Sequence, residues 1–219
     1  MDKRAILFAN GEVESYGFLE KLVTDKDFLV AVDGGLRHLG ALGLPADLLI
    51  GDLDSVTPAQ LQGLSGSQTE IIRFPIEKDE TDLELALVEV VKRGVGEVVI
   101  IGGLGGRIDQ TLANLFLLLL PDLAGKSVRL LTQNEEIFVI QKQAVIHGGE
   151  GNLVSLIPLN GIATGVTTIG LMYPLTDETL HPDRSRGISN RMLTDKAEVQ
   201  VKDGVLLCVQ TWKLENGEQ

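Results

Sequence analysis

Leu48-Leu49-Ile50-Gly51-Asp52-Leu53-Asp54-Ser55 is a short apolar run that ends in two carboxylates. A continuous apolar run of this kind is typical of a strand buried on both faces of a parallel sheet. Ligands of open α/β sheets bind outside the carboxyl ends of the strands. The stretch therefore predicts a parallel sheet and also the edge of that sheet at which a site would lie.

The same pattern recurs along the first 135 residues. Five further apolar runs are candidate strands, at residues 5–9, 28–32, 71–74, 98–101 and 128–131. Helical spacing separates several of them, and one helix is expected over residues 81–93, with Asp79 as its N-cap and Gly94 as its stop. A second helix around residues 112–119 is apolar nearly all round, which predicts burial between layers. Residues 1–135 are therefore expected to form an α/β domain.

After Asn134 the pattern changes to short alternating strands with no helical segment. Residues 198–202 and 205–209 alternate on either side of Asp203-Gly204, which is a type I′ hairpin signal. Residues 136–219 are therefore predicted to form an all-β domain, a small sandwich. The single cysteine, Cys208, excludes an intrachain disulfide and is expected to be a packed core thiol.

The charge of the chain limits the classes of partner. The 219 residues carry a formal net charge of −12, whereas nucleic-acid binders present a basic face. The most apolar segment, residues 112–120, is too short to cross a bilayer, and residues 1–4 lead straight into a strand without the apolar region of a signal peptide. We expect a cytoplasmic protein that binds neither nucleic acid nor membrane.

Two more charged clusters follow predicted strands: Lys78-Asp79-Glu80-Thr81-Asp82 and Gly102-Gly103-Leu104-Gly105-Gly106-Arg107-Ile108-Asp109. Two carboxylates about 4 Å apart repel by about 4 kcal/mol at an effective dielectric of about 20. A convergent set of carboxylates therefore requires a counter-cation. Oxygen ligands beside Lys and Arg indicate Mg²⁺ and phosphate.

The acidic pairs also have structural interpretations when each is taken alone. Asp52 and Asp54 can point to one face of an extended segment, or Asp54 and Ser55 can cap the next helix. Asp79 and Asp82 can face one side of the first helical turn, or serve only as caps.

The glycine-rich turns have the same two interpretations. Four glycines before a helix free backbone N–H groups for an anion, with Arg107 as a phosphate donor, or they form only a tight turn. Asp109 can cap the helix or join the metal site, and Asp33-Gly34-Gly35 is either a sharp turn or a nucleotide contact. Taken together, the clusters favour a Mg²⁺–nucleotide site, with substrate and reaction open.

Taken in order, these motifs resemble those of the thiamine pyrophosphokinase family. The matching stretches are DGG at 33–35, GDLDS at 51–55, KDETDLE at 78–84, GGLGGRID at 102–109, GLMYPL at 170–175 and GISN at 187–190. The resemblance implies a Rossmann-like N-terminal domain, a C-terminal β-sandwich and a homodimer with active sites at the subunit interface. It also implies transfer of the pyrophosphoryl group of ATP to the hydroxyethyl group of thiamine, with release of AMP.

The resemblance also implies roles for particular residues. The implied Mg²⁺ ligands are Asp52, Asp54, Asp79 and Asp82. The implied catalytic residues are these four together with Arg107 and Asp109. Contacts to ATP are Asp33, Gly34, Gly35, Lys78, Thr81, Gly105, Gly106 and Arg107. Contacts to thiamine are Tyr173, Ser189, Asn190 and Gln110.

Gln110 departs from the family pattern, because many bacterial members carry His at this position. Gln cannot act as a general base at neutral pH, so Asp109 or another carboxylate would have to supply one. Two alternatives stay open at this point: another Mg²⁺-dependent phosphotransferase or nucleotidyltransferase, and a nucleotide-binding regulatory module without catalysis. The nucleotide released from ATP separates them.

Overall fold

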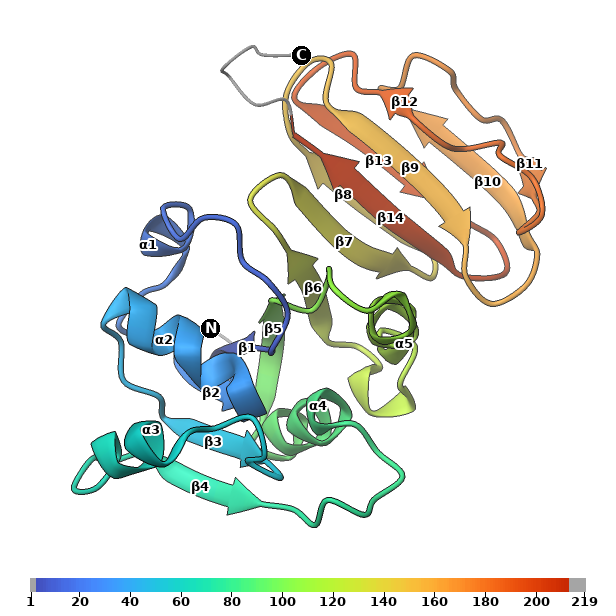
Figure 1. Cartoon of the computed structure of the whole chain (residues 1–219). Coiled ribbons are helices and arrows are strands. Elements are labelled where there is room, and N and C mark those ends of the chain that lie inside the picture. The colour runs from blue at the N-terminus through green and yellow to red at the C-terminus, as the bar shows by residue number, and fades with distance from the viewer. Residues whose placement is uncertain (1–2, 213–219) are drawn as a thin grey trace. The chain divides into compact units, whose positions relative to one another are not determined.

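The computed structural model describes residues 3–212 (Figure 1). The chain divides into two compact units, Met1–Gln133 and Asn134–Gln219. Each unit has its own cluster of buried apolar side chains.

The first unit is built on six parallel strands. They are β1 (Lys3–Phe8), β2 (Phe28–Val32), β3 (Leu48–Gly51), β4 (Glu70–Arg73), β5 (Val95–Ile101) and β6 (Ser127–Leu131), in the spatial order β6-β5-β1-β2-β3-β4. Each apolar run predicted from the sequence forms one of them. Ile6, Leu49 and Ile100 are wholly buried, as a sheet covered on both faces requires. The edge strand β4 is the exception, because Ile71 is 47% exposed.

Short helices connect these strands. They are α1 (Leu19–Leu22), α2 (Leu36–Leu42), α3 (Pro58–Gly63), α4 (Asp82–Lys92) and α5 (Ile108–Leu117), with single 3₁₀ turns at Asp33–Gly35 and Pro121–Leu123. None of the helices in residues 3–212 combines the length and apolarity that a membrane span requires.

Two helix caps differ from those expected. Thr81, not Asp79, is the N-cap of α4, and its hydroxyl accepts a hydrogen bond from the Glu84 N–H at 3.2 Å. Thr57, not Asp54 or Ser55, caps α3 through a reciprocal capping box. Thr81 and Thr57 both have extended backbones one residue before the helix, which is the conformation that an N-cap needs.

The predicted burial of the second helix is wrong. No side chain of α5 is buried, and Ile108, Leu112 and Phe116 are 71%, 49% and 52% exposed. These residues are four apart and form one outward stripe, which the described part of the chain leaves uncovered. A composition that is apolar all round could not reveal this, because it says nothing about what lies beside the helix.

The second unit is all β, as predicted. Its strands are β7 (Glu135–Ile140), β8 (Gln143–His147), β9 (Leu153–Pro158), β10 (Ala163–Ile169), β11 (Glu178–Leu180), β12 (Asn190–Arg191), β13 (Lys196–Gln200) and β14 (Leu206–Thr211). They form two antiparallel arrays, β12-β9-β14-β7 and β11-β10-β13-β8. Leu156, Val166, Val199 and Cys208, from both arrays, belong to one buried core.

The predicted hairpin at Asp203-Gly204 is wrong. β13 pairs with β8 and β10, whereas β14 pairs with β7 and β9. The turn therefore links strands of different arrays, and Asp203 forms a bridge with Thr164 instead. The local turn signal is present, with Gly204 at a φ of +93°, but partners distant in sequence decide the pairing of both strands.

Candidate active site

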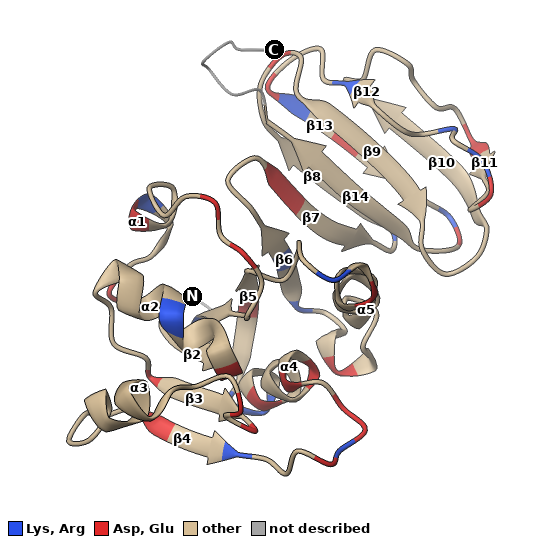
Figure 2. Cartoon of the chain, in the orientation of Figure 1, with Lys and Arg blue, Asp and Glu red and all other residues tan. Residues whose placement is uncertain are grey.

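Three carboxylates meet at the carboxyl ends of the parallel strands. Asp33 follows β2, Asp52 follows β3, and Asp82 opens α4. One oxygen from each carboxylate lies within 4.8 Å of the others. Asp33 and Asp52 are buried and Asp82 is half-buried, so the group is largely withdrawn from water. Figure 2 shows acidic residues around α4 and along the loop that leads into it from β4.

Lys78 is the cation inside this group. Its Nζ lies 2.9 Å from Oδ2 of Asp52 and 3.1 Å from Oδ1 of Asp82, and its side chain is 10% exposed. Burial alone would lower the pKa of Lys78, but its interactions with the carboxylates of Asp52 and Asp82 outweigh burial and raise it.

The two carboxylates that Lys78 contacts respond differently. The hydrogen bond from Lys78 is the main reason that the pKa of Asp52 is lowered. The pKa of Asp82 is raised, first by burial and then by the charges of Asp52 and Asp33, which together exceed the effect of Lys78. The site therefore holds more negative charge than one ammonium balances.

The donor set fits a hard divalent cation. Oδ1 of Asp33 is buried without a hydrogen-bond partner. Oδ1 of Asp82 is also buried, and it has the Lys78 ammonium 3.1 Å away as an ion-pair partner but no hydrogen bond. Buried carboxylate oxygens that lack partners are costly. Oxygen ligands of this kind are the ones that Mg²⁺ takes in proteins.

Backbone conformation selects Asp52 over Asp54. An extended segment would place both on one face, but Leu53 has a φ of +66°, which breaks the alternation. The Asp54 N–H donates to Oδ1 of Asp52 at 3.1 Å, and the exposed Asp54 carboxylate accepts a hydrogen bond from Ser55. The structure thus brings Asp33 to Asp52 and Asp82, and leaves Asp54 and the exposed Asp79 outside that trio.

The trio lies on the wall of a pocket of about 670 Å³. Other residues expected in the site that line this pocket are Asp54, Lys78, Thr81, Gly105, Gly106, Arg107 and Gln110. Gly34 and Gly35 are buried and are not among the lining residues. A Cβ on Gly35 would lie 1.7 Å from the Phe8 carbonyl oxygen, so this glycine is needed for close packing against β1.

Arg107 and Asp109 form a pair of their own. Nε and Nη2 of Arg107 donate to the two carboxylate oxygens of Asp109, and both side chains are exposed. This hydrogen bond lowers the pKa of Asp109, which makes its carboxylate a weak proton acceptor. Arg107, not Asp109, is the N-cap residue of α5, and the Asp109 carboxylate accepts a hydrogen bond from the Gln110 N–H at 3.0 Å. Asp109 lies outside the carboxylate trio and does not line the pocket.

The sequence did not indicate four polar residues that line the pocket: Asn10, Glu12, Arg37 and Asn114. Nη2 of Arg37 donates to the carbonyls of Asn10 and Gly11, at 2.7 and 2.9 Å. Asn114 donates to the Gly103 carbonyl at 2.7 Å. Asn10 follows a predicted strand, which is the one signal that was available. Arg37 and Asn114 lie on helices and depend on tertiary contacts.

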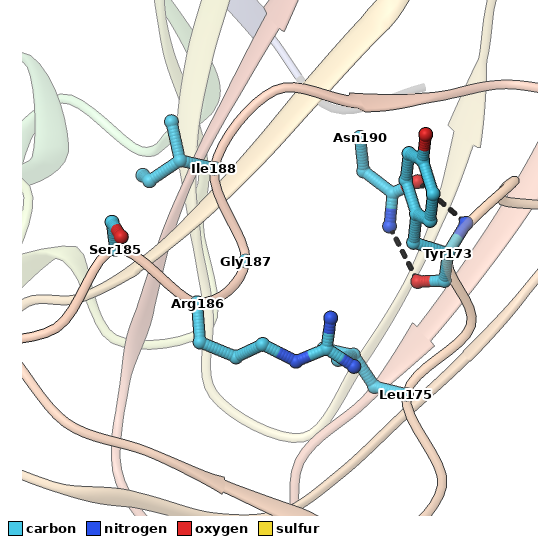
Figure 3. A pocket seen from close by; sticks show the side chains of 7 residues that line it. All are labelled: Tyr173, Leu175, Ser185, Arg186, Gly187, Ile188 and Asn190. Atoms are coloured by element: carbon cyan, nitrogen blue, oxygen red, sulfur yellow. Dashed lines mark hydrogen bonds between the residues drawn. The ribbon is translucent and has the colours of Figure 1, made fainter.

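A second pocket, of about 380 Å³, lies in the second unit (Figure 3). Its lining residues are Tyr173, Leu175, Ser185, Arg186, Gly187, Ile188 and Asn190. Of the residues expected to contact thiamine, the structure brings Tyr173 and Asn190 together here. Ser189 is exposed and does not line this pocket, and Gln110 lines the pocket of the first unit.

A buried carboxylate trio with a lysine, beside a glycine-rich loop at the carboxyl edge of a parallel sheet, is the kind of site that metal-dependent phosphoryl-transfer enzymes use. Residues 19–131 match the family model for the thiamin pyrophosphokinase catalytic domain. Residues 136–206 match the model for the thiamin pyrophosphokinase vitamin B1 binding domain. The chain belongs to the thiamine pyrophosphokinase family.

Individual relatives agree with this assignment. The chain is 26% identical over 191 residues to thiamine pyrophosphokinase of Bacillus subtilis, covering 86% of this chain and 89% of the relative. A crystal structure of that enzyme from Bacillus subtilis has the same fold, with a TM-score of 0.88, 24% identity, and coverage of 97% and 100%. A family protein from Enterococcus faecalis gives a TM-score of 0.82, 27% identity and the same coverage. The predicted family and the predicted thiamine diphosphokinase activity are confirmed.

Proposed function

We propose that the chain transfers the pyrophosphoryl group of ATP to the hydroxyethyl oxygen of thiamine, which gives thiamine diphosphate and AMP. The observation that carries the proposal is the largely buried trio Asp33, Asp52 and Asp82 with Lys78 beside it. The trio lies in the region that matches the family's catalytic domain.

Mg²⁺ is the proposed metal, and the three carboxylates of the trio are its proposed ligands. When bound, Mg²⁺ supplies positive charge to phosphate oxygens and to the leaving oxygen of AMP. Lys78 is already placed between two of these ligands, and the exposed guanidinium of Arg107 lines the same pocket and would serve as a bidentate donor to phosphate.

In the proposed reaction the hydroxyethyl oxygen of thiamine forms a bond to the β-phosphorus of ATP. The bond from the β-phosphorus to the oxygen that bridges it to the α-phosphorus breaks, and AMP leaves with that electron pair. The hydroxyl proton passes to a base or to water. Gln110 cannot accept it, and the pair with Arg107 makes Asp109 a weak acceptor. Positioning and charge neutralisation therefore supply most of the proposed rate enhancement.

Thiamine is proposed to bind at the second pocket, within the region that matches the family's vitamin B1 binding domain. Tyr173 offers an aromatic face, which attracts a permanently cationic thiazolium. Arg186 would oppose that cation, but Glu178 accepts two hydrogen bonds from its guanidinium, at 2.9 and 2.7 Å, and balances its charge.

The two units are proposed to have different roles, one in nucleotide binding and catalysis and the other in thiamine binding. Residues 1–135 would form a Rossmann-like nucleotide-binding catalytic domain, and their parallel strand order supports this. Residues 136–219 would form a β-sandwich that binds thiamine and dimerises, and the core shared by its two arrays supports the sandwich. A cytoplasmic location stays a prediction from the sequence.

A homodimer is proposed on one structural ground, which lies in the first unit and not in the domain expected to dimerise. The outward stripe of α5, formed by Ile108, Leu112 and Phe116, is an apolar helix face that a second copy of the chain would cover. Sedimentation velocity on the full chain should give twice the monomer mass, whereas a monomer at working concentrations would contradict the dimer.

The test of the reaction is the identity of the products. ATP and Mg²⁺ are incubated with and without thiamine, and AMP, ADP, inorganic pyrophosphate and thiamine diphosphate are quantified. Equal amounts of AMP and thiamine diphosphate, formed only with thiamine, are expected. ADP would indicate simple phosphorylation, and pyrophosphate would indicate nucleotidyl transfer. ATP binding without turnover would indicate a regulatory module.

A further inference from the structure

Asn190 and Tyr173 both line the second pocket, but one is buried and the other is exposed. The Asn190 side chain belongs to a residue that is 5% exposed, whereas Tyr173 is 58% exposed. Figure 3 shows the Asn190 amide turned toward the backbone of Tyr173, with the aromatic ring standing beside the hollow. The asparagine is therefore part of the frame of the pocket, and the tyrosine is part of its accessible wall.

The Asn190 amide binds both backbone groups of Tyr173. Its Oδ1 accepts from the Tyr173 N–H at 3.0 Å, and its Nδ2 donates to the Tyr173 carbonyl at 2.7 Å. Oδ1 also accepts from the Arg191 N–H at 2.9 Å. An amide oxygen has two lone pairs, so Oδ1 has no acceptor capacity left, and a single N–H of Nδ2 is free for any ligand.

We call the two hydrogen bonds between the Asn190 amide and the Tyr173 backbone the clamp, and neighbouring strand contacts support it. Asn190 pairs with Val154 on β9, so it is anchored to the sheet. On the approach to Tyr173, Leu171 forms a bridge with Met192, and the Met172 N–H donates to the Arg191 carbonyl at 2.8 Å. The clamp thus extends the antiparallel pairing of residues 171–172 with residues 191–192 as far as Tyr173.

The residue before Asn190 has an uncommon backbone. Ser189 has a φ of +55°, a left-handed conformation that is costly for a residue with a Cβ. Its N–H donates to the Ser155 hydroxyl at 3.0 Å. Costly conformations of this kind cluster at ligand sites, and this one turns the chain at the point where Asn190 enters β12.

We propose that Asn190 is a positioning residue, which fixes the Tyr173 backbone so that the aromatic ring forms a rigid wall for the organic cation of the substrate. This inference rests on the proposed function, because that function supplies thiamine as the cation. It differs from the expectation that Asn190 contacts thiamine directly, because both lone pairs of its Oδ1 already accept hydrogen bonds from backbone N–H groups. A wall that is ordered before binding saves the entropy of ordering it afterwards.

A double-mutant cycle separates the two roles. Thiamine Kd is measured by calorimetry for the full chain and for the variants Asn190→Ala, Tyr173→Ala and both together. We expect each single change to raise Kd about tenfold, and the double variant to be no weaker than Tyr173→Ala alone, because Asn190 acts through Tyr173. Multiplicative losses in the double variant would show direct contact and overturn the proposal. Asn160→Ala, at an exposed asparagine of the same unit, is the matched control and should leave Kd unchanged.

A second measurement needs no substitution and no activity. Amide hydrogen exchange in the unmodified chain should show the Tyr173 N–H protected at a level like that of the Met192 N–H, which is bonded to the Asn152 carbonyl. Exchange as fast as in an exposed loop would overturn the clamp. If the unmodified chain binds no thiamine while Tyr173 is protected, the proposed function fails and the clamp stands. If it binds thiamine while Tyr173 is unprotected, the reverse holds.

Discussion

The two pockets are built on different physical principles. In the first unit, buried charges oppose one another around Lys78, and two carboxylate oxygens have no hydrogen-bond partner. In the second, the neutral amide of Asn190 makes three hydrogen bonds, two of them to the backbone of the aromatic residue Tyr173. A site for a divalent metal needs uncompensated negative charge, whereas a site for a flat organic cation needs a fixed shape. The comparison predicts that substitutions in the first pocket lower turnover, whereas substitutions in the second pocket weaken thiamine binding.

The largest effect is expected at the trio. Asp52→Asn should lower kcat about 10³-fold, because it removes a charged oxygen from the proposed metal and phosphate site. Thiamine affinity should not change, since the second pocket keeps every residue. Steady-state kinetics and calorimetry measure the two quantities. Asp122→Asn, at an exposed site outside the pocket, is the control. Near-normal turnover in Asp52→Asn would remove Asp52 from the site.

Removal of Lys78 should reveal the excess negative charge of the trio as a loss of unfolding free energy. Lys78→Met leaves the carboxylates without their cation and should cost about 3 kcal/mol of unfolding free energy in metal-free buffer. Saturating Mg²⁺ should return about 2.7 kcal/mol when its concentration is about 100 times Kd. Chemical unfolding with and without Mg²⁺ measures both changes.

The second pocket supplies the contrast for that experiment. Tyr173→Ala should unfold with the same Mg²⁺ dependence as the unmodified chain, because its pocket holds no proposed metal ligand. An equal response to Mg²⁺ in Lys78→Met and in the unmodified chain would contradict the charge-imbalance account.

The scaffold of the first unit also depends on a charge pair, and pH tests it. Arg4 donates two hydrogen bonds, each of 2.7 Å, to Asp27, whose side chain is 3% exposed. Burial would raise the pKa of Asp27, but the bonds from Arg4 and Thr24 prevail and lower it below its ordinary 3.8. The stabilisation is therefore complete above about pH 3.8 and is lost as the pH falls through the lower folded value. Asp27→Asn should cost about 2 kcal/mol at pH 7, with a difference from the unmodified chain that shrinks at acid pH.

The smallest effect is expected from the exposed pair in the second unit. Arg186 lowers the pKa of Glu178 through a hydrogen bond, but Glu178 is 36% and Arg186 47% exposed, so water screens the pair. Glu178→Gln should leave the unfolding free energy at pH 7 nearly unchanged. It should weaken thiamine binding more clearly, because it leaves Arg186 uncompensated in the pocket. Unchanged Kd would separate Arg186 from the thiamine site.

Much of the fold was readable from local sequence. All six parallel strands, the all-β second unit and the placing of Asp52, Lys78 and Asp82 at one sheet edge follow from apolar runs and what comes after them. These features are local, or they follow from the rule that parallel strands present their carboxyl ends at one edge.

The features that the sequence did not indicate are all tertiary or conformational. Leu53, with its positive φ, leaves Asp54 outside the carboxylate trio although Asp54 lines the same pocket, and Asp33 joins the trio because β2 and β3 are neighbours. The role of Asn190 in binding the Tyr173 backbone involves residues 17 apart in the sequence, and no pattern in the sequence indicates it.

The most direct test of the account is the position of the metal. Crystals grown with Mn²⁺, a stand-in for Mg²⁺, and a non-hydrolysable ATP analogue would give an anomalous peak at the metal. We predict a peak within bonding distance of carboxylate oxygens of Asp33, Asp52 and Asp82. A peak on Asp54 and Asp79, with the trio left unbound, would contradict the site that the geometry defines.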